Sequence, residues 1–141
     1  MSDTIDIALT DSPILADPLA KRVIVPATGA SVLFLGTVRE EHHGRAVDRL
    51  DYKAYEPMAL REMQKIGEAI VERWRAKRVV IHHRLGTLQI GEASIGIALS
   101  FPHRVDSFEA LRYAIDTFKQ TVPIWKREHF TDGEAVWVEG S

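Results

Sequence analysis

The chain has 141 residues, a net charge of −2 from 18 basic and 20 acidic side chains, and no cysteine. This length suits one hydrophobic core, so we expect a single domain over residues 1–141. The balanced charge argues against a general nucleic-acid-binding protein, and the lack of cysteine excludes disulfides, thiolate nucleophiles and Cys-ligated metal sites.

The sequence contains no segment typical of export or of membrane insertion. The N-terminal ten residues include acidic side chains and no basic stretch, unlike a secretory signal peptide. No apolar run approaches the ~18 residues that a membrane-spanning helix needs. We therefore expect a cytoplasmic protein that has no membrane contact.

The first third of the chain predicts two strands and a helix. Residues 5–9 alternate between apolar and polar and predict a strand. Asp17-Pro18 is a typical helix start with Asp17 as the cap, and this helix must end near Pro26. Residues 31–38 predict a strand buried on both faces, with a bulge at Gly36, and residues 39–45 predict a polar loop.

The middle of the chain contains the clearest helix. Residues 47–55 predict a strand with Leu50, Tyr52 and Ala54 on one face. A helix begins at residues 56–57, and its apolar residues recur every three or four positions. That stripe consists of Ala59, Met63, Ile66, Ile70 and Trp74. Strands are expected over residues 79–84 and 93–101, with a turn over residues 86–91.

The last third predicts a second long helix and a hairpin. Asp106 and Ser107 cap the helix, and Glu109 is spaced for a capping box with Asp106. Its expected buried stripe is Phe108, Leu111, Ile115 and Phe118. Residues 122–123 end the helix, and residues 124–130 and 135–138 predict a hairpin. Paired strands between helices predict an α+β fold with a mostly antiparallel sheet and packed helices.

Two histidine pairs raise the question of a metal site. His82 and His83 are neighbours in a predicted strand, so their side chains point to opposite faces and cannot easily share one ion. His42 and His43 lie in a predicted solvated loop. Since there is also no cysteine and no His pair at helical spacing, we expect no metal site.

Cationic side chains gather in three segments that lie where regular elements end, which is the usual place for binding groups. If residues 36–39, 101–104 and 119–128 converge, five cations would form a pocket for an anionic ligand. These cations are Arg39, His103, Arg104, Lys119 and Lys126. Each one taken alone is better explained as a solvated side chain or as a complement to a helix dipole than as a binding group. The residues alone therefore indicate an anion pocket with two lysines and no particular reaction.

Five segments, in order along the chain, give the sequence a specific resemblance to a known family. They are residues 34–39, 50–59, 82–86, 103–108 and 119–126, the last with the pattern Lys-x-x-Val-Pro-Ile-Trp-Lys. Together they resemble the catalytic (large) subunits of molybdopterin synthase. Several ordered motifs over most of a chain are far more specific than any single short motif.

The resemblance implies a fold, a reaction and partners. The expected fold is similar to an α/β hammerhead with a small extra antiparallel sheet. The expected enzyme is a sulfurtransferase of molybdenum cofactor biosynthesis that converts cyclic pyranopterin monophosphate to molybdopterin, without a bound cofactor or metal. The sulfur would come from a thiocarboxylate at the C-terminus of a small ubiquitin-like subunit. Two copies of this chain would form the homodimer core of a heterotetramer.

The same resemblance implies the site residues. Lys119 and Lys126 match the two catalytic lysines. The positions that contact substrate are Thr37, Val38, Arg39, His103, Arg104, Lys119, Lys126, Arg127 and Glu128. Position 127 is Arg where many relatives have Lys, which keeps the charge and changes the geometry.

Two other classes of function remain as alternatives. One is a non-catalytic anion-binding module that kept the fold and lost the reaction. The other is a phosphoester hydrolase that uses the same cations, although such an enzyme would need a metal or an obvious nucleophile.

Overall fold

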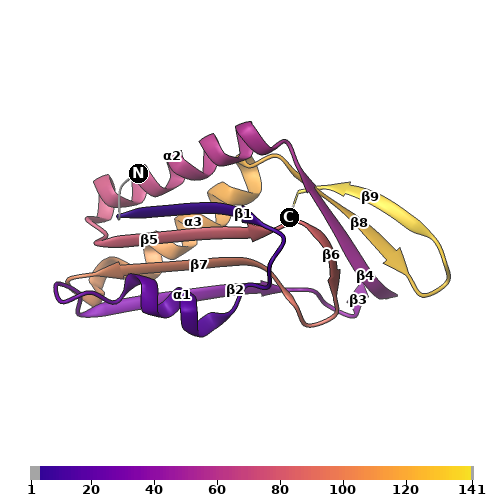
Figure 1. The fold of residues 1–141 in the computed structure, drawn as a ribbon, viewed down its shortest axis with the longest axis horizontal. Coiled ribbons are helices and arrows are strands. Elements are labelled where there is room, and N and C mark those ends of the chain that lie inside the picture. Colours follow the sequence, from indigo (N-terminus) through magenta and orange to yellow (C-terminus); the bar gives the residue numbers. More distant parts are fainter. Residues whose placement is uncertain (1–3, 141) are drawn as a thin grey trace.

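A computed structural model describes residues 4–140, and their main feature is a pair of β-sheets that lie end to end (Figure 1). The first sheet has the strand order β1-β5-β7-β2. Its strands are β1 (Ile5–Thr10), β5 (Arg78–Arg84), β7 (Ala93–Phe101) and β2 (Ala30–Thr37). Only the β1–β5 pair in this sheet is parallel.

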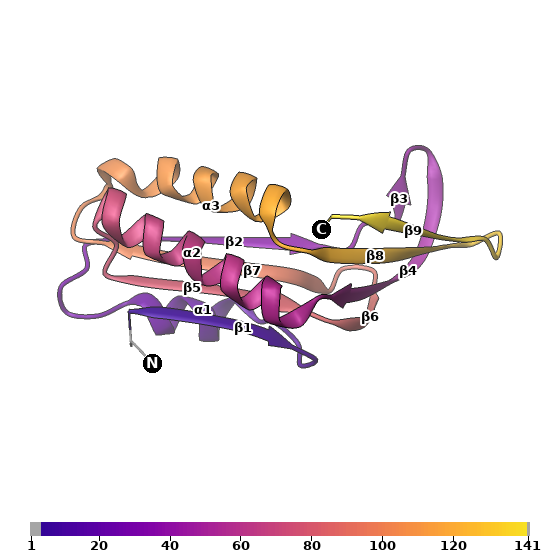
Figure 2. The ribbon, with the colours of Figure 1, turned by 90° about the horizontal axis from the view of Figure 1, so that it is seen from above.

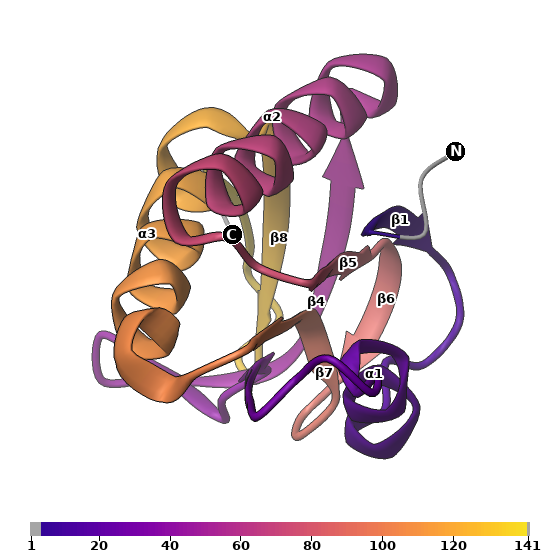
Figure 3. The same ribbon diagram turned by 90° about the vertical axis from the view of Figure 1, so that its left-hand side faces the viewer.

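The helices cover both faces of the first sheet (Figures 2 and 3). α2 (Glu56–Trp74) and α3 (Ser107–Thr121) pack on one face, and α1 (Ala16–Val23) packs on the other. A short 3-10 turn over Arg104–Asp106 leads into α3. α2 buries Ala59, Met63, Ile66, Ile70 and Trp74, which confirms the predicted stripe.

The second sheet is antiparallel and projects beyond the end of the first. It has the order β3-β4-β8-β9, and β6 pairs with β4 outside that path. Its strands are β3 (Glu41–His42), β4 (Arg45–Ala54), β6 (Gly86–Gln89), β8 (Ile124–Phe130) and β9 (Ala135–Glu139). The expected α+β class, with mostly antiparallel strands and a small extra sheet, is confirmed.

One hydrophobic core joins the two sheets. It contains Ile81, Ile97 and Leu99 from the first sheet and Leu50 and Ile124 from the second. The single domain expected over residues 1–141 stays a prediction, and this shared core supports it.

The starts of α1 and α3 differ from the prediction. Leu15 is the N-cap of α1, so Asp17 lies in the first helical turn instead of capping it. Asp106 does occupy the N-cap of α3, but no side-chain capping bond forms there within residues 4–140, so the predicted capping box is wrong. Of the stripe predicted for α3, Phe118 is buried and Leu111 and Ile115 are half-buried against the core, whereas Phe108 is 76% exposed and was assigned wrongly. The buried residues of this helix are Ser107, Ala110, Ala114 and Phe118.

Three predictions about strands and loops are also corrected. β2 is not buried on both faces, since exposed or half-buried positions recur along it, although the bulge expected at Gly36 is confirmed by a register shift between Gly36 and Thr37. The predicted loop 39–45 contains β3, and the predicted turn 86–91 contains β6. Both short strands depend on pairing with β4, which the local sequence does not reveal.

Among residues 4–140, no helix is long and apolar enough to cross a membrane.

Candidate functional site

A pocket of about 360 Å³ opens where the two sheets meet. This volume lies in the range of small-molecule sites. Its lining comes from the end of β2 and the segment after it, the start of β7, the last turns of α3, and one face each of β4 and β8. Segments far apart in the sequence therefore share one cavity.

The inner wall of the pocket is apolar apart from a few buried polar groups. Phe34, Leu50, Ile95 and Phe118 supply most of the apolar surface. Burial raises the pKa of the Tyr52 phenol, and the nearby Glu128 carboxylate acts in the same direction. The phenol is therefore a neutral hydrogen-bonding group near pH 7.

A buried histidine supports this wall from behind. The His83 ring stacks on Phe118 with centroids 5.6 Å apart and meets Tyr52 edge-on at 5.0 Å. Its Nδ1 donates to the Arg84 carbonyl at 2.8 Å, which fixes the neutral tautomer. Burial lowers the pKa of His83 to about 4, so the ring is uncharged and packs as an aromatic side chain.

Three of the five predicted cations do converge on this pocket. Lys119 follows buried Phe118 at the end of α3, at the margin of the helix's inward face as expected. Lys126 lies on the face of β8 that is turned to the pocket, and Arg39 follows the bulge that ends β2. These three cations outnumber the two carboxylates in the same lining, which favours an anionic ligand.

Thr37 and Val38 line the same pocket, next to Arg39. The backbone N–H of Val38 donates to the Glu92 carbonyl at 3.0 Å, and its carbonyl accepts from Gly91 at 2.8 Å. Both polar backbone groups of Val38 are thus occupied, and its side chain is 4% exposed. Val38 offers a ligand apolar contact, whereas Thr37 keeps a hydroxyl.

Glu128 is the buried anion of the pocket, only 4% exposed. It faces the same way as Lys126, two residues earlier on β8, because side chains alternate along a strand. Its carboxylate pairs with His42 Nδ1 at 2.6 Å. This pair joins β3 to β8, two strands of the second sheet that are not neighbours.

Arg127 lies on the opposite face of β8, outside the residues that line the pocket. Its guanidinium carbon is 6.0 Å from the centroid of the Trp137 ring on β9. The register pairs Arg127 with Trp137 directly. A substrate in the pocket of this chain would not contact Arg127 unless it reached around the strand.

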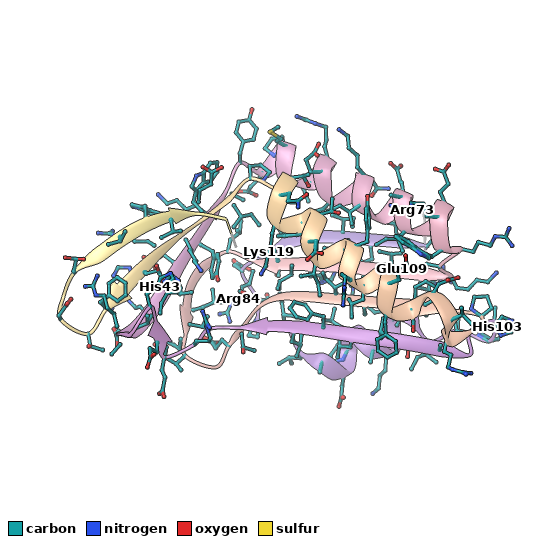
Figure 4. The ribbon with its side chains drawn as sticks, turned by 180° about the vertical axis from the view of Figure 1, so that it is seen from behind. His43, Arg73, Arg84, His103, Glu109 and Lys119 are labelled. Atoms are coloured by element: carbon teal, nitrogen blue, oxygen red, sulfur yellow. The ribbon has the colours of Figure 1, made fainter. Side chains whose placement is uncertain are left out.

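His103 and Arg104 are also outside the pocket, because they lie at the other end of α3 from Lys119 (Figure 4). At 1.5 Å per residue, Arg104 and Lys119 are roughly 20 Å apart along the helix. The two groups of one chain cannot bind the same small phosphate. Arg104 and His103 are exposed, at a turn beside the exposed apolar side chains of Val105 and Phe108.

Sequence reasoning missed several pocket residues. His42 and Glu41 were assigned to a solvated loop, yet both line the pocket. Ser94 also lines it, and its hydroxyl donates to the Gly36 carbonyl at 3.3 Å. The same-face alternation of Leu50 and Tyr52 was a usable signal for β4, whereas the His42–Glu128 contact joins segments far apart in the sequence and gave none.

The structure also bears on the two histidine pairs that raised the question of a metal site. His82 binds Asp6 on one side of β5, while His83 faces the core on the other. In the part of the chain that the structure describes, no three His, Asp or Glu side chains are grouped closely enough to hold a metal ion.

The sequence matches a family model described as MoaE protein over residues 9–121. It is 47% identical to the molybdopterin synthase catalytic subunit of Halalkalibacterium halodurans, over 93% of this chain and 83% of that protein. The match with this relative covers 131 residues and is therefore longer than the segment that the family model covers.

Two solved structures share the fold. The crystal structure of molybdopterin synthase from Staphylococcus aureus superposes with a TM-score of 0.86 and 39% identity, covering 98% of each chain. A chain from the complex of subunits 1 and 2 of the molybdopterin-converting factor from Helicobacter pylori gives a TM-score of 0.79. It is 20% identical and covers 94% of this chain and 89% of that chain, so it shows the fold alone.

Proposed function

This chain belongs to the MoaE protein family, whose curated relatives are catalytic subunits of molybdopterin synthase, and we propose that it catalyses the same sulfur transfer. The substrate is cyclic pyranopterin monophosphate and the product is molybdopterin, the dithiolene ligand of the molybdenum cofactor. The observation that carries the proposal is the convergence of Arg39, Lys119 and Lys126 on one pocket of suitable size.

The sulfur is delivered by a partner. The 141 residues include no cysteine, so this chain has no thiol that could hold the sulfur. A small ubiquitin-like subunit brings it as a C-terminal thiocarboxylate, whose negative charge suits a pocket lined by three cations. The complex of two subunits known for the Helicobacter pylori protein of the same fold is consistent with such a partner.

Each pocket cation has a distinct role in the proposed reaction. Arg39 binds the phosphate, because a planar guanidinium can donate two parallel hydrogen bonds to it. Lys119 orients the thiocarboxylate as its sulfur attacks a side-chain carbon of the pterin. Lys126 stabilises the charge that develops as the cyclic ester opens and supplies a proton. These two lysines are the catalytic residues.

The remaining substrate contacts come from residues beside these cations. Thr37 donates or accepts through its hydroxyl and Val38 packs on the substrate. Glu128 contributes through its position beside Lys126. Arg127 lies on the other face of β8, so its place in the proposed set requires a substrate or partner tail that reaches that face.

His103 and Arg104 can bind the phosphate only if a second copy of the chain supplies them. Their distance from Lys119 along α3 excludes a contribution to their own pocket. We therefore propose a homodimer in which these two residues of one protomer complete the pocket of the other, at the core of a heterotetramer. Exposed Phe108 and Val105, next to Arg104, are suitable apolar contacts for such an interface.

Mixing two inactive variants tests the homodimer. If Lys119→Ala and Arg104→Ala protomers exchange, one of the two pockets in each mixed dimer has both residues. With random exchange, about a quarter of all sites regain activity. No recovery after demonstrated exchange would contradict a shared pocket, while leaving the reaction itself untouched.

The reaction is tested with purified components. The protein is mixed with the cyclic pterin phosphate and a small subunit that ends in either thiocarboxylate or carboxylate. The mass of the pterin product is then determined by mass spectrometry. We expect a dithiolene only with the thiocarboxylate. A complex without product would favour the non-catalytic binding module, and phosphate release without the partner would favour the hydrolase. We expect the reaction to take place in the cytoplasm of the cell.

A further inference from the structure

His42 is the one imidazole among the described side chains that line the pocket, and the proposed reaction has so far given it no role. It lies on β3, and its Nδ1 is 2.6 Å from the Glu128 carboxylate. The His42 side chain is 24% exposed, whereas that of Glu128 is 5% exposed. The carboxylate is thus shielded while the imidazole stays accessible from the cavity.

This contact fixes which nitrogen of His42 can react. A carboxylate this close to Nδ1 favours the tautomer that carries the proton on Nδ1, so the neutral ring keeps its free lone pair on Nε2. Within residues 4–140, Nε2 has no other partner. A histidine held by a buried carboxylate at one nitrogen, with the other nitrogen open, is the arrangement that general-base catalysis requires.

The proposed reaction contains a step that needs such a base. Attack by the thiocarboxylate sulfur on the pterin leaves that sulfur bonded both to the substrate and to the acyl carbon of the small subunit. Water must then cleave this acyl–sulfur bond. Water is a weak nucleophile near pH 7, and removal of its proton during attack accelerates the step. A protonated lysine cannot accept that proton, because an ammonium group is a donor only.

We propose that His42, oriented by Glu128, is the general base that releases the spent small subunit. Nε2 takes a proton from the attacking water while the new C–O bond forms. The acyl C–S bond then breaks, and the imidazolium returns the proton to the departing sulfur. The products are a carboxylic acid on the small subunit, which ionises, and a thiol on the pterin. Glu128 stabilises the imidazolium that exists between the two transfers. This inference rests on the proposed function.

Its electrostatic surroundings suit this role. The charged and titratable groups near the His42 ring come from its own segment and from β4, β8 and α3. Those that line the pocket with His42 are Arg39, Glu41, Tyr52, Lys119, Lys126 and Glu128, while His43 is the neighbouring ring and Arg45 is the residue paired with His42 on β4. Arg45 is paired with Asp132 and Glu134, which leaves Glu128 as the carboxylate in direct contact with the ring.

The chain offers a closely matched pair of variants. In His42→Asn the side-chain amide can still donate to Glu128, so the contact that ties β3 to β8 survives while the base is lost. In the control His43→Asn, the neighbouring ring, whose centroid lies 4.1 Å away, is removed instead. Residue 43 has a φ of 51°, a conformation that Asn adopts readily, so the control should fold normally.

The experiment is a single turnover with the thiocarboxylated small subunit and cyclic pterin phosphate, quenched at intervals and analysed by mass spectrometry. We expect His42→Asn to accumulate the covalent small-subunit–pterin adduct and to release it about 10²-fold more slowly or worse. The His43→Asn control should behave as the unchanged protein does. Added imidazole should restore release in His42→Ala, which a purely structural role of His42 would not allow.

Two results would overturn the inference. One is release by His42→Asn at the rate of the His43→Asn control. The other is a slower first transfer with no adduct, which would make His42 a structural residue. Failure of the proposed function looks different, since the unchanged protein would then form neither adduct nor dithiolene.

Discussion

Two strands that line the pocket, β7 from the first sheet and β8 from the second, differ in kind. In the first sheet, β7 is buried at all nine positions and has no charged residue. In the second, β8 has a buried residue at each end and Lys126, Arg127 and Glu128 between them. Since both sheets contribute to the same core, the difference reflects the separate roles of these strands at the pocket. At the pocket, β7 supplies stability and an apolar wall, and β8 supplies charge.

The pocket lies at the junction because neither sheet could form it alone. The first sheet offers Phe34 and Ile95, which give a ligand an apolar surface but no charge. The second offers Lys126 and Glu128 on one face of β8, and α3 bridges the two with Phe118 and Lys119. Substitutions in the first sheet should therefore change stability, and substitutions of the charged groups should change activity.

The largest effect is expected at Lys119. Lys119→Ala removes a cation from the reaction centre and should lower the rate of dithiolene formation by about 10²- to 10³-fold. Because the side chain is exposed, the free energy of unfolding should change by less than about 0.5 kcal/mol. Lys65→Ala, on the exposed face of α2, is the control. Near-normal turnover by Lys119→Ala would refute the assignment.

The next effect is a pH dependence that belongs to the first sheet. The pKa of His83 is lowered from 6.5 to about 4, so between these values the unfolded chain binds a proton that the folded chain does not. Stability should therefore fall as the pH drops from 6.5 to 4, by as much as about 3 kcal/mol.

Denaturant unfolding at several pH values measures this dependence. In the variant His83→Phe, which cannot titrate, the loss of stability over that window should shrink by the same amount. If stability depended on pH equally in His83→Phe and the unchanged protein, the buried ring would not be the cause of the pH dependence. The carboxylates whose pKa values are lowered, such as Asp6, Asp51 and Glu92, are present in both proteins, so the difference between the two pH profiles isolates His83.

Substitutions of Arg39 test its proposed role in binding the substrate phosphate. Arg39→Ala should weaken binding of the cyclic pterin phosphate by about 2 kcal/mol, the value of a charge-assisted hydrogen bond. Arg39→Lys should recover part of this, since it keeps the charge and loses the planar fork. Calorimetric titration measures the affinities. Equal affinity in all three proteins would remove Arg39 from the phosphate site.

The smallest effect concerns the packing of α1 on the first sheet. A Cβ at Gly96 would clash with Leu19 Cδ1 and lie 2.8 Å from Ile14 Cγ2, so in Gly96→Ala these two side chains, which pack α1 and the segment before it on β7, must shift. We expect a loss of about 1 to 2 kcal/mol in the free energy of unfolding and an unchanged rate per folded molecule.

A double variant checks the cause. Gly96→Ala combined with Leu19→Ala should cost less than the sum of the two single changes, because the smaller side chain removes the clash. Additive costs, or a fall in turnover, would show that the two sheets are less separate in function than proposed.

Regular elements were predictable because local patterns specify them. The stripe of α2 and the hairpin of β8 and β9 follow from spacing and turn residues, and the structure confirms both. Phe108 was assigned wrongly because a 3-10 turn precedes α3 and the buried face is set by packing on β2 and β7. β3 and β6 were missed because strands of two and four residues exist only through their partner, β4.

The site was predictable only in part, for a similar reason. Lys119 could be placed from its position after Phe118, and Lys126 from the motif that includes it. The separation of Arg104 from Lys119 follows from the length of the helix between them, and it could have been calculated from the sequence. The pairing of His42 with Glu128 required the register of the second sheet, which no local pattern contains.

The central claim is that one phosphorylated ligand sits between Lys119 and Lys126, and lysine footprinting tests it most directly. The protein is treated briefly with an amine-acetylating reagent, with and without saturating cyclic pterin phosphate, and each lysine is quantified by peptide mass spectrometry. The account predicts that the ligand protects Lys119 and Lys126 together, while Lys65 and Lys21, exposed on α2 and α1, react as before. Unchanged labelling of both pocket lysines at saturating ligand would contradict it.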